Sequence, residues 1–348
     1  MFFLNFFRKK IQDKKPSTLV KDINFVSSSF NDEILYKIKS FGKKNSDKIF
    51  YVIRRSPGSG MFSNINFVIH HLFISEIFKF IPIIDMENYP NYYNEKVKIL
   101  STKNSWEYYF YPINNYKLKD VYKSRNVIIC ESLTNNNPYI TGYLKLPYSE
   151  KKYFKKYLNF KEYILKEKNI FIKKYFNNKK ILGVHFRGSD QKISTGHPFP
   201  PTLKQIIFNI NKLLNIYKYD LIFLVTEDKK YFEVLKKEYG KKICFTNSYR
   251  TSNDAFKEYP RKNHRYLLGF EIILNTLILS ETDHILGNDS NVVGSAISLS
   301  KKKKLFTKID NDFNSKNIFF AFFLWKIKSL LPESFGGFKI KYFGIIKK

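Results

Sequence analysis

The chain has 348 residues, of which 43% are hydrophobic and 18% aromatic, and this composition excludes a disordered protein. Its 61 Lys and Arg residues against 30 Asp and Glu give a formal net charge of +31, which favours an anionic partner: a nucleic acid, an anionic membrane surface or a phosphorylated substrate. Because the lysines are spread along the whole chain, AT-rich codon usage would produce the same excess, and charge alone does not choose among these partners.

The N-terminus carries apolar residues ahead of its charges and has no small-residue cleavage site, so it predicts no secretory signal. The two cysteines, Cys130 and Cys244, exclude a disulfide framework and a cysteine-based zinc site, and they fit a reducing compartment. No stretch of about 18 uncharged apolar residues occurs, so a membrane-spanning helix is not expected.

The first half of the chain predicts one strand–loop–helix–strand unit. Residues 49–56 indicate a strand that runs into the turn-forming cluster Pro57–Gly60. An apolar segment of helical length follows over residues 66–80, and residues 81–85 indicate a second strand. This order is typical of half of a doubly wound α/β domain.

The second half repeats this theme more clearly. Buried strands are predicted at residues 180–186, 220–226, 242–246 and 284–287, with helical stretches between them and a lysine-rich helical region over 151–180 before them. Their spacing suits right-handed βαβ crossovers and a parallel sheet. Two such domains would face each other across a cleft.

Polar residues follow the first of these strands abruptly. His185, Arg187 and Asp190 come after the apolar run, and Gly188 gives the backbone freedom to turn between them. Ligands of α/β sheets bind at the carboxyl ends of strands, and the arginine fork matches a diphosphate. An Arg–Asp ion pair that closes a turn explains the same residues, so two interpretations stay open.

The later strand ends carry polar residues too. Glu227 and Asp228 precede a helix, and Ser290 and Asn291 precede another; each pair is either a helix cap or part of an anion site. Arg265, in the polar start of the helix that runs to residue 279, is a solvated cap or a second anion contact.

Several common motifs are missing from the sequence. It contains no G-x-G-x-x-G fingerprint, no P-loop and no G-x-S-x-G elbow. What remains is a metal-independent site built on arginine, serine and helix termini, which fits a nucleotide diphosphate leaving group. Near the C-terminus, the aromatic segment 318–331 predicts a helix that is either docked on the protein or placed in a membrane interface.

Three of these segments resemble, in order, the motifs of the α1,6-fucosyltransferase and protein O-fucosyltransferase superfamily. They are residues 185–198, 225–228 and 280–291. Ser59–Gly60 before an apolar helix is similar to the family's glycine loop, and residues 105–112 are similar to its tryptophan-containing stretch. The resemblance extends from about residue 50 to residue 299.

The resemblance implies a GT-B fold of two Rossmann-like, doubly wound α/β domains, with GDP-fucose as donor, inversion at the anomeric carbon and no required metal or other cofactor. The predicted divisions are a basic and aromatic tail (1–30), an acceptor-side domain (31–175), a nucleotide-sugar-binding domain (176–311) and a C-terminal aromatic and basic helix and tail (312–348).

The resemblance also implies residue roles. Arg187 would bind the diphosphate and stabilise the departing GDP, His185 would lie against the nucleoside, and Ser290 would hold a phosphate oxygen. Glu227 and Asp228 would line the sugar or ribose region. The full predicted donor-binding set is His185, Arg187, Gly188, Glu227, Asp228, Asn275, Asp283, Ser290, Asn291, Gly60 and Arg265.

Two positions depart from the family pattern. Asn275 stands where relatives commonly place a carboxylate that pairs with guanine, and Glu271 or Asp283 would have to substitute for it. The loop after Asp190 lacks the glutamate that some members offer as base, so Asp190 and His197, with Arg187, are the predicted catalytic residues.

The resulting hypothesis is a bacterial cytoplasmic fucosyltransferase of surface-polysaccharide assembly. Its acceptor would be a glycan or lipid-linked glycan, with peripheral contact to the anionic inner membrane. The alternatives are the same fold with another GDP-sugar, such as a heptose or mannose derivative, a basic nucleic-acid-binding protein, or a non-catalytic sugar-binding relative. The scattered basic residues and the lack of a nucleic-acid-binding motif favour an enzyme that binds no nucleic acid.

Overall fold

The computed structural model describes residues 36–58, 60–130, 150–188, 190–340 and 345–347, so the predicted tail of residues 1–30 lies outside the described residues. The chain divides into two compact units, Met1–Lys161 (unit 1) and Glu162–Lys348 (unit 2). The division comes before the predicted boundary at residue 175, because helix α8 (Glu162–Tyr175) packs on helix α11 (His264–Leu279) of unit 2.

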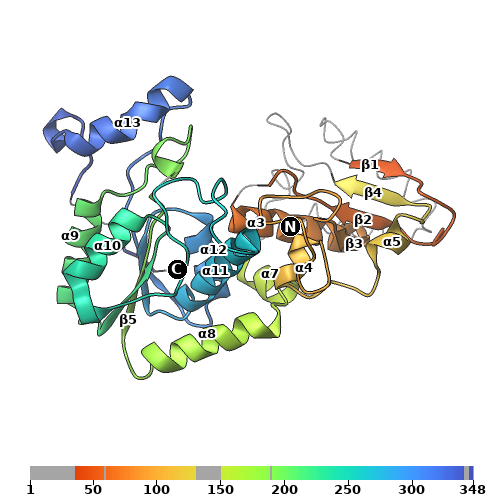
Figure 1. Ribbon diagram of the computed structural model, residues 1–348, viewed down its shortest axis with the longest axis horizontal. Coiled ribbons are helices and arrows are strands. Elements are labelled where there is room, and N and C mark those ends of the chain that lie inside the picture. Colours follow the sequence, from red (N-terminus) through yellow and green to blue (C-terminus); the bar gives the residue numbers. More distant parts are fainter. Residues whose placement is uncertain (1–35, 59, 131–149, 189, 341–344, 348) are drawn as a thin grey trace. The chain divides into compact units, whose positions relative to one another are not determined.

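Unit 1 is built on a four-stranded sheet in the order β1-β4-β2-β3 (Figure 1). Strands β2, β3 and β4 run parallel, and β1 pairs antiparallel with β4. The elements of this unit are β1 (Tyr36–Lys39), β2 (Phe50–Ile53), α3 (Met61–Phe78), β3 (Ile81–Ile84), α4 (Ser105–Tyr109), α5 (Leu118–Val121), β4 (Val127–Cys130) and α7 (Glu150–Tyr157). The predicted strand–loop–helix–strand unit is confirmed as β2, α3 and β3.

Unit 2 contains a six-stranded sheet in the order β10-β9-β8-β5-β6-β7. All neighbouring strands are parallel except β10, which pairs antiparallel with β9. The strands are β5 (Ile181–His185), β6 (Leu221–Val225), β7 (Ile243–Cys244), β8 (His284–Gly287), β9 (Leu305–Lys308) and β10 (Ile345–Lys347). The four strands predicted for this half are confirmed, and β9 and β10 are additional.

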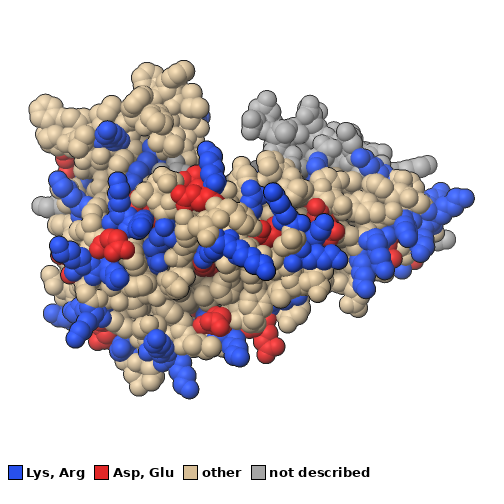
Figure 2. All heavy atoms as spheres, viewed as in Figure 1, with Lys and Arg blue, Asp and Glu red and all other residues tan. Residues whose placement is uncertain are grey.

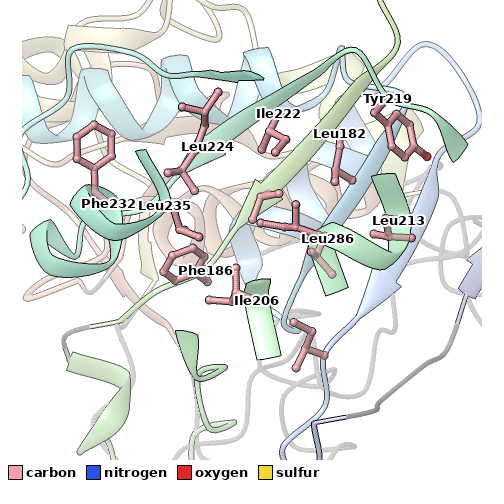
Figure 3. Packing of buried hydrophobic residues seen from close by; sticks show 14 residues of the cluster. Leu182, Phe186, Ile206, Leu213, Tyr219, Ile222, Leu224, Phe232, Leu235 and Leu286 are labelled. Carbon is pink, nitrogen blue, oxygen red and sulfur yellow. The ribbon is translucent and has the colours of Figure 1, made fainter. Parts of the chain in front are cut away.

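Helices cover both faces of this sheet because side chains of a strand alternate between faces. Leu182, Val184 and Phe186 pack with the helices α9 (Leu203–Tyr217) and α10 (Lys229–Tyr239) (Figure 3). On the opposite face, Phe223 of β6 meets Phe171 of α8. The remaining described helices of unit 2 are α12 (Asn291–Leu299) and α13 (Ile318–Leu330), with short 3₁₀ turns η1 (Asp190–Lys192), η2 (Gly240–Lys242) and η3 (Glu333–Phe335).

Gly183 in the middle of β5 allows helix α11 to lie close to the sheet. A Cβ at this position would lie 2.5 Å from Leu279 Cδ1 and 2.8 Å from Thr282 Oγ1. The glycine therefore sets the spacing between the sheet and α11. The arrangement of unit 2 confirms the predicted doubly wound α/β fold class. None of the described helices is both long and apolar enough to cross a membrane.

Candidate functional site

The candidate site lies where β5, β6 and β8 end at the same edge of the sheet in unit 2. The last residue of β5, His185, pairs with Val225 of β6 and with Gly287 of β8. Because these strands are parallel, the residues that follow them emerge side by side, at the edge where open α/β sheets bind ligands. Arg187 follows β5 at this edge.

His185 is buried at the end of β5, with 1% of its surface exposed. Burial, together with the nearby charge of Arg187, lowers the pKa of its imidazole to about 3, so the ring is neutral at physiological pH. Among the described residues, none forms a hydrogen bond with its Nδ1. Packing, rather than a hydrogen bond to this nitrogen, holds the imidazole ring. The contact of His185 with a nucleoside stays a prediction.

The turn after β5 is held by a carboxylate from the neighbouring strand. Glu227 Oε1 accepts a hydrogen bond from the Gly188 backbone N–H at 3.0 Å and lies 3.9 Å from Arg187 Nε. Arg187 thus forms an ion pair with Glu227 at the end of β6. The side chains of Arg187 and Glu227 are about one-third exposed, so both can be reached from solvent.

Asp228 is buried and uses both of its carboxylate oxygens inside the protein. Oδ1 caps helix α10 by accepting a hydrogen bond from the Tyr231 backbone N–H at 3.2 Å, so the capping interpretation of this residue is confirmed. Oδ2 lies 3.2 Å from Lys192 Nζ. The Lys192 ammonium in turn lies over the Tyr231 and Trp325 rings, at 4.7 Å and 4.8 Å from their centroids.

Lys192 was absent from the predicted site residues. It belongs to the polar loop that follows Arg187, and this position in the first motif is the one signal that could have identified it. Its partners come from helices α10 and α13, which are distant in sequence.

The loop between β8 and α12 brings a second set of polar groups to the same edge. Ser290 is the N-cap of α12, and its Oγ accepts a hydrogen bond from the Val293 backbone N–H at 3.3 Å. Asn288 is buried and donates to Gln191 Oε1 at 3.2 Å. Its Oδ1 is buried without a partner among the described residues. The exposed Asn291 begins the helix, whose N-terminal N–H groups and dipole favour an anion.

Both residues considered for base recognition on α11 are engaged within the protein. Asn275 Oδ1 accepts a hydrogen bond from Thr246 at 2.6 Å, and its Nδ2 donates to Ser248 at 3.0 Å. Glu271 accepts two hydrogen bonds from the Arg261 guanidinium, at 2.5 Å and 3.0 Å. These contacts fix α11 to the segment that follows β7.

Asp283 was predicted at the donor site, and the structure corrects this expectation. Its Oδ2 accepts a hydrogen bond from the Ile181 backbone N–H at 2.7 Å, at the amino end of β5 and thus at the opposite edge of the sheet from Arg187. A carboxylate just before β8 pins the start of the adjacent parallel strand. It cannot meet a ligand at the carboxyl ends.

The other predicted residues occupy separate places. Gly60 is the N-cap of α3 in unit 1. Arg265 lies in the first turn of α11, on the helix that carries Glu271 and Asn275 rather than at a strand end. Asp190 begins η1, and the exposed His197 accepts a backbone hydrogen bond from Asn314 at 2.8 Å.

Two general properties bear on the kind of ligand. Within the described residues, no group of three or more His, Cys, Asp or Glu side chains is placed to hold a metal ion. Lys and Arg side chains are scattered over the visible face of the molecule rather than gathered in one stripe (Figure 2).

No family model and no curated protein sequence matches the chain. Solved structures do match it. The NodZ α1,6-fucosyltransferase co-crystallised with GDP aligns at 12% identity over 76% of this chain and 96% of its own, with a TM-score of 0.50. The chain shares the fold of this fucosyltransferase.

Two further structures are similar to this chain. NodZ from Bradyrhizobium aligns at 13% identity over 76% of this chain and 97% of its own, with a TM-score of 0.48. A variant of Arabidopsis thaliana FUT1 in complex with GDP aligns at 11% identity over 78% and 73%, with a TM-score of 0.45.

Proposed function

We propose that the chain is an inverting, metal-independent glycosyltransferase that moves fucose from GDP-fucose to a glycan acceptor. The observation that carries the proposal is the sheet edge of unit 2, where Arg187 follows β5 and the N-terminus of α12 follows the adjacent β8. A guanidinium beside a helix N-terminus suits a diphosphate. The fold shared with a fucosyltransferase that was crystallised with GDP supports GDP as the leaving group.

Leaving-group stabilisation is the main task of this site. Arg187 donates two parallel hydrogen bonds to the diphosphate and stabilises the charge that develops on departing GDP. The backbone N–H groups at the start of α12 and the Ser290 hydroxyl hold a second phosphate oxygen. Because His185 is neutral, Arg187 and the helix supply the positive potential.

The acceptor hydroxyl must lose its proton as the new bond forms. Asp190 and His197 are the proposed proton acceptors, and both belong to the loop that follows Arg187. The transition state is oxocarbenium-like, so departure of GDP leads the reaction and a strong base is not required.

Recognition of guanine would require hydrogen-bond acceptors on α11. A guanine edge needs an acceptor pair, whereas the acceptors of Asn275 and Glu271 already take hydrogen bonds from Thr246 and Arg261. A ligand would have to replace these contacts. This requirement is the same for every GDP-sugar, so the alternative donor, another GDP-sugar such as a heptose or mannose derivative, differs from GDP-fucose only in its sugar.

The proposed setting is the bacterial cytoplasm, where the enzyme would add a sugar during assembly of a surface polysaccharide. A lipid-linked glycan is the proposed acceptor, with peripheral contact to the inner membrane. The net charge of +31 suits an anionic membrane surface.

A donor panel tests the proposal. The full chain is incubated with GDP-fucose, GDP-mannose or a GDP-heptose and with glycan from the same organism, and GDP release and product mass are measured. GDP-fucose should increase the product mass by one deoxyhexose residue, with an unchanged rate in EDTA. Transfer from a different GDP-sugar would support the alternative donor. An unchanged product mass with every donor would refute the enzyme.

A further inference from the structure

Helix α13 presents a large apolar surface to solvent. Six side chains make up what we call its outer face: Ile318, Phe319, Phe320, Phe322, Phe323 and Leu330. Their exposed fractions range from 57% to 79%. In the space-filling view, the region of α13 is mostly uncharged (Figures 1 and 2). Contiguous exposed apolar surface of this kind marks an interaction site.

The opposite side of α13 holds it to the rest of unit 2. Ala321 is its buried residue, and Trp325 Nε1 donates a hydrogen bond to the Pro200 carbonyl at 2.9 Å. Asn314, just before the helix, donates to the carbonyls of Lys192 and Ala321. The exposed aromatic residues are therefore on a fixed helix.

Basic residues occur within α13 and close to it in sequence. Lys316 precedes α13, Lys326 lies in it and is exposed, and Lys339 follows it. Two carboxylates, Asp312 and Glu333, occur in the same stretch of residues 312–340, which carries four lysines in all. A helix that combines exposed aromatic residues with an excess of neighbouring lysines is complementary to the headgroup region of anionic lipids.

The length of the helix decides how it would meet a bilayer. Its 13 residues extend over about 20 Å, less than the hydrocarbon thickness of about 30 Å. Such a helix lies along the interface with its apolar side in the acyl boundary, and lysines reach the headgroups with their flexible stems.

We propose that the outer face of α13 docks on an anionic phospholipid surface, with the helix axis in the membrane plane. The inner side of the same helix contacts Lys192 and Pro200, so docking holds the loop beside the candidate site at the lipid surface. This proposal deepens the proposed function, on which it rests for the acceptor but not for lipid binding itself.

Vesicle flotation of the full chain tests the proposal. Binding is measured with phosphatidylcholine vesicles with and without phosphatidylglycerol. The wild type should bind the anionic vesicles more tightly. The triple variant Phe319→Gln, Phe322→Gln, Phe323→Gln should reduce the partition coefficient roughly 100-fold. The triple variant Lys316→Gln, Lys326→Gln, Lys339→Gln should abolish the preference for anionic lipid while weak binding to neutral vesicles persists.

A matched control replaces exposed aliphatic residues on other helices of unit 2: Ile170→Gln, Ile216→Gln and Val234→Gln, whose exposed fractions are 50%, 56% and 43%. This variant should bind vesicles like the wild type, and thermal unfolding should show that all variants fold. An equal loss of vesicle binding in the control and the Phe variant would overturn the proposal. The proposal would also be overturned if the wild type bound no vesicles and instead formed a dimer that the Phe substitutions dissociate.

The readouts separate the two proposals. Vesicle binding without transfer from any GDP-sugar supports the docking surface and refutes the enzyme. Transfer to a soluble acceptor without vesicle binding does the reverse.

Discussion

Gly188 and Asp228 are in close contact beside Arg187. A Cβ on Gly188 would lie 2.7 Å from Asp228 Oδ2 and 2.8 Å from Asp228 Cβ, which is closer than side-chain atoms approach. Any larger residue would displace the carboxylate that caps α10 and pairs with Lys192. The glycine is thus needed for close packing as well as for the turn.

Gly188→Ala should destabilise the protein by about 1–3 kcal/mol, because the new methyl group forces the cap of α10 to move. The matched control is Gly294→Ala in α12, where a Cβ meets nothing within 4 Å. This control should stabilise the protein by about 0.5–1 kcal/mol, since alanine restricts the unfolded chain. Urea unfolding measures both, and equal effects of the two substitutions would contradict the packing argument.

Arg187→Ala should lower kcat for donor turnover by about 100- to 1000-fold, the usual effect of removing one group that stabilises developing charge. Arg187→Lys should recover only part of the rate, because an ammonium cannot donate two parallel hydrogen bonds in a fixed fork. Steady-state GDP release is the measurement. Arg125→Ala, an exposed arginine of unit 1, serves as the control. An unchanged kcat in Arg187→Ala would remove this residue from the mechanism.

Residues next to strand ends could be predicted from the sequence, because a buried apolar run shows where a parallel strand stops. His185, Arg187, Glu227 and Ser290 were identified in this way, and β5, β6 and β8 bring them to one edge. Asp283 was misplaced since it precedes its strand, and the amino ends of parallel strands lie at the opposite edge.

The engagement of Asn275 could not have been predicted. Its partners, Thr246 and Ser248, lie more than 25 residues away in a loop without a sequence pattern, and only the tertiary structure brings them to α11.

Among the elements, α13 and the residues just before it hold the loop that follows β5 in place. The Trp325 ring lies beside the Lys192 ammonium and bonds the Pro200 carbonyl, and backbone hydrogen bonds join Gly196 to Ser315 and Phe199 to Asp312. An isolated helix of 13 residues would be marginal in water, so these contacts also keep α13 folded.

Trp325→Ala should weaken the contacts between α13 and this loop, since it removes a hydrogen bond and one of the two rings beside Lys192. Amide hydrogen exchange in residues 192–200 should accelerate about tenfold, as expected for a loss of about 1.4 kcal/mol in local stability. Ile327→Ala, at a half-exposed position of the same helix, should leave this exchange unchanged. Equal acceleration in both variants would indicate that α13 itself had unfolded.

For the whole molecule, the sequence predicted the class of each half and the strands that alternate with helices. It did not predict β1, β4, β9 or β10. Two of these, β1 and β10, pair antiparallel at the edge of a sheet, outside the regular βαβ spacing. β9 is a four-residue strand with partly buried ends, so it has neither the length nor the continuous apolar pattern of β5 or β6.

Three buried histidines make stability depend on pH. Burial lowers the pKa of His71 in unit 1 to about 3, and it lowers those of His185 and His284 in unit 2 to about 3 and about 4. The unfolded chain takes up protons near pH 6.5, where the folded protein does not, so acid favours unfolding. Stability is therefore full above about pH 6.5 and falls as pH decreases toward 4.

When the pH is lowered from about 7.5 to about 5.5, each of these histidines should decrease the free energy of unfolding by about 1 kcal/mol. Urea unfolding followed at both pH values checks this, with salt kept constant. Both units should lose stability, because unit 1 contains His71 and unit 2 contains His185 and His284. A stability that stays constant over this range would contradict the neutral state of the buried rings.

The chain reaches α13 from β9 and returns from it to β10, which pairs with β9 at the sheet edge. On the return, the Lys339 carbonyl accepts a hydrogen bond from Gln205 of α9 at 2.8 Å. A segment attached at one end only would act as a flexible tether, and the attached protein would rotate freely. A helix attached at both ends passes its own tilt to the sheet, so unit 2 held through α13 would keep one tilt relative to the surface and rotate only about the surface normal.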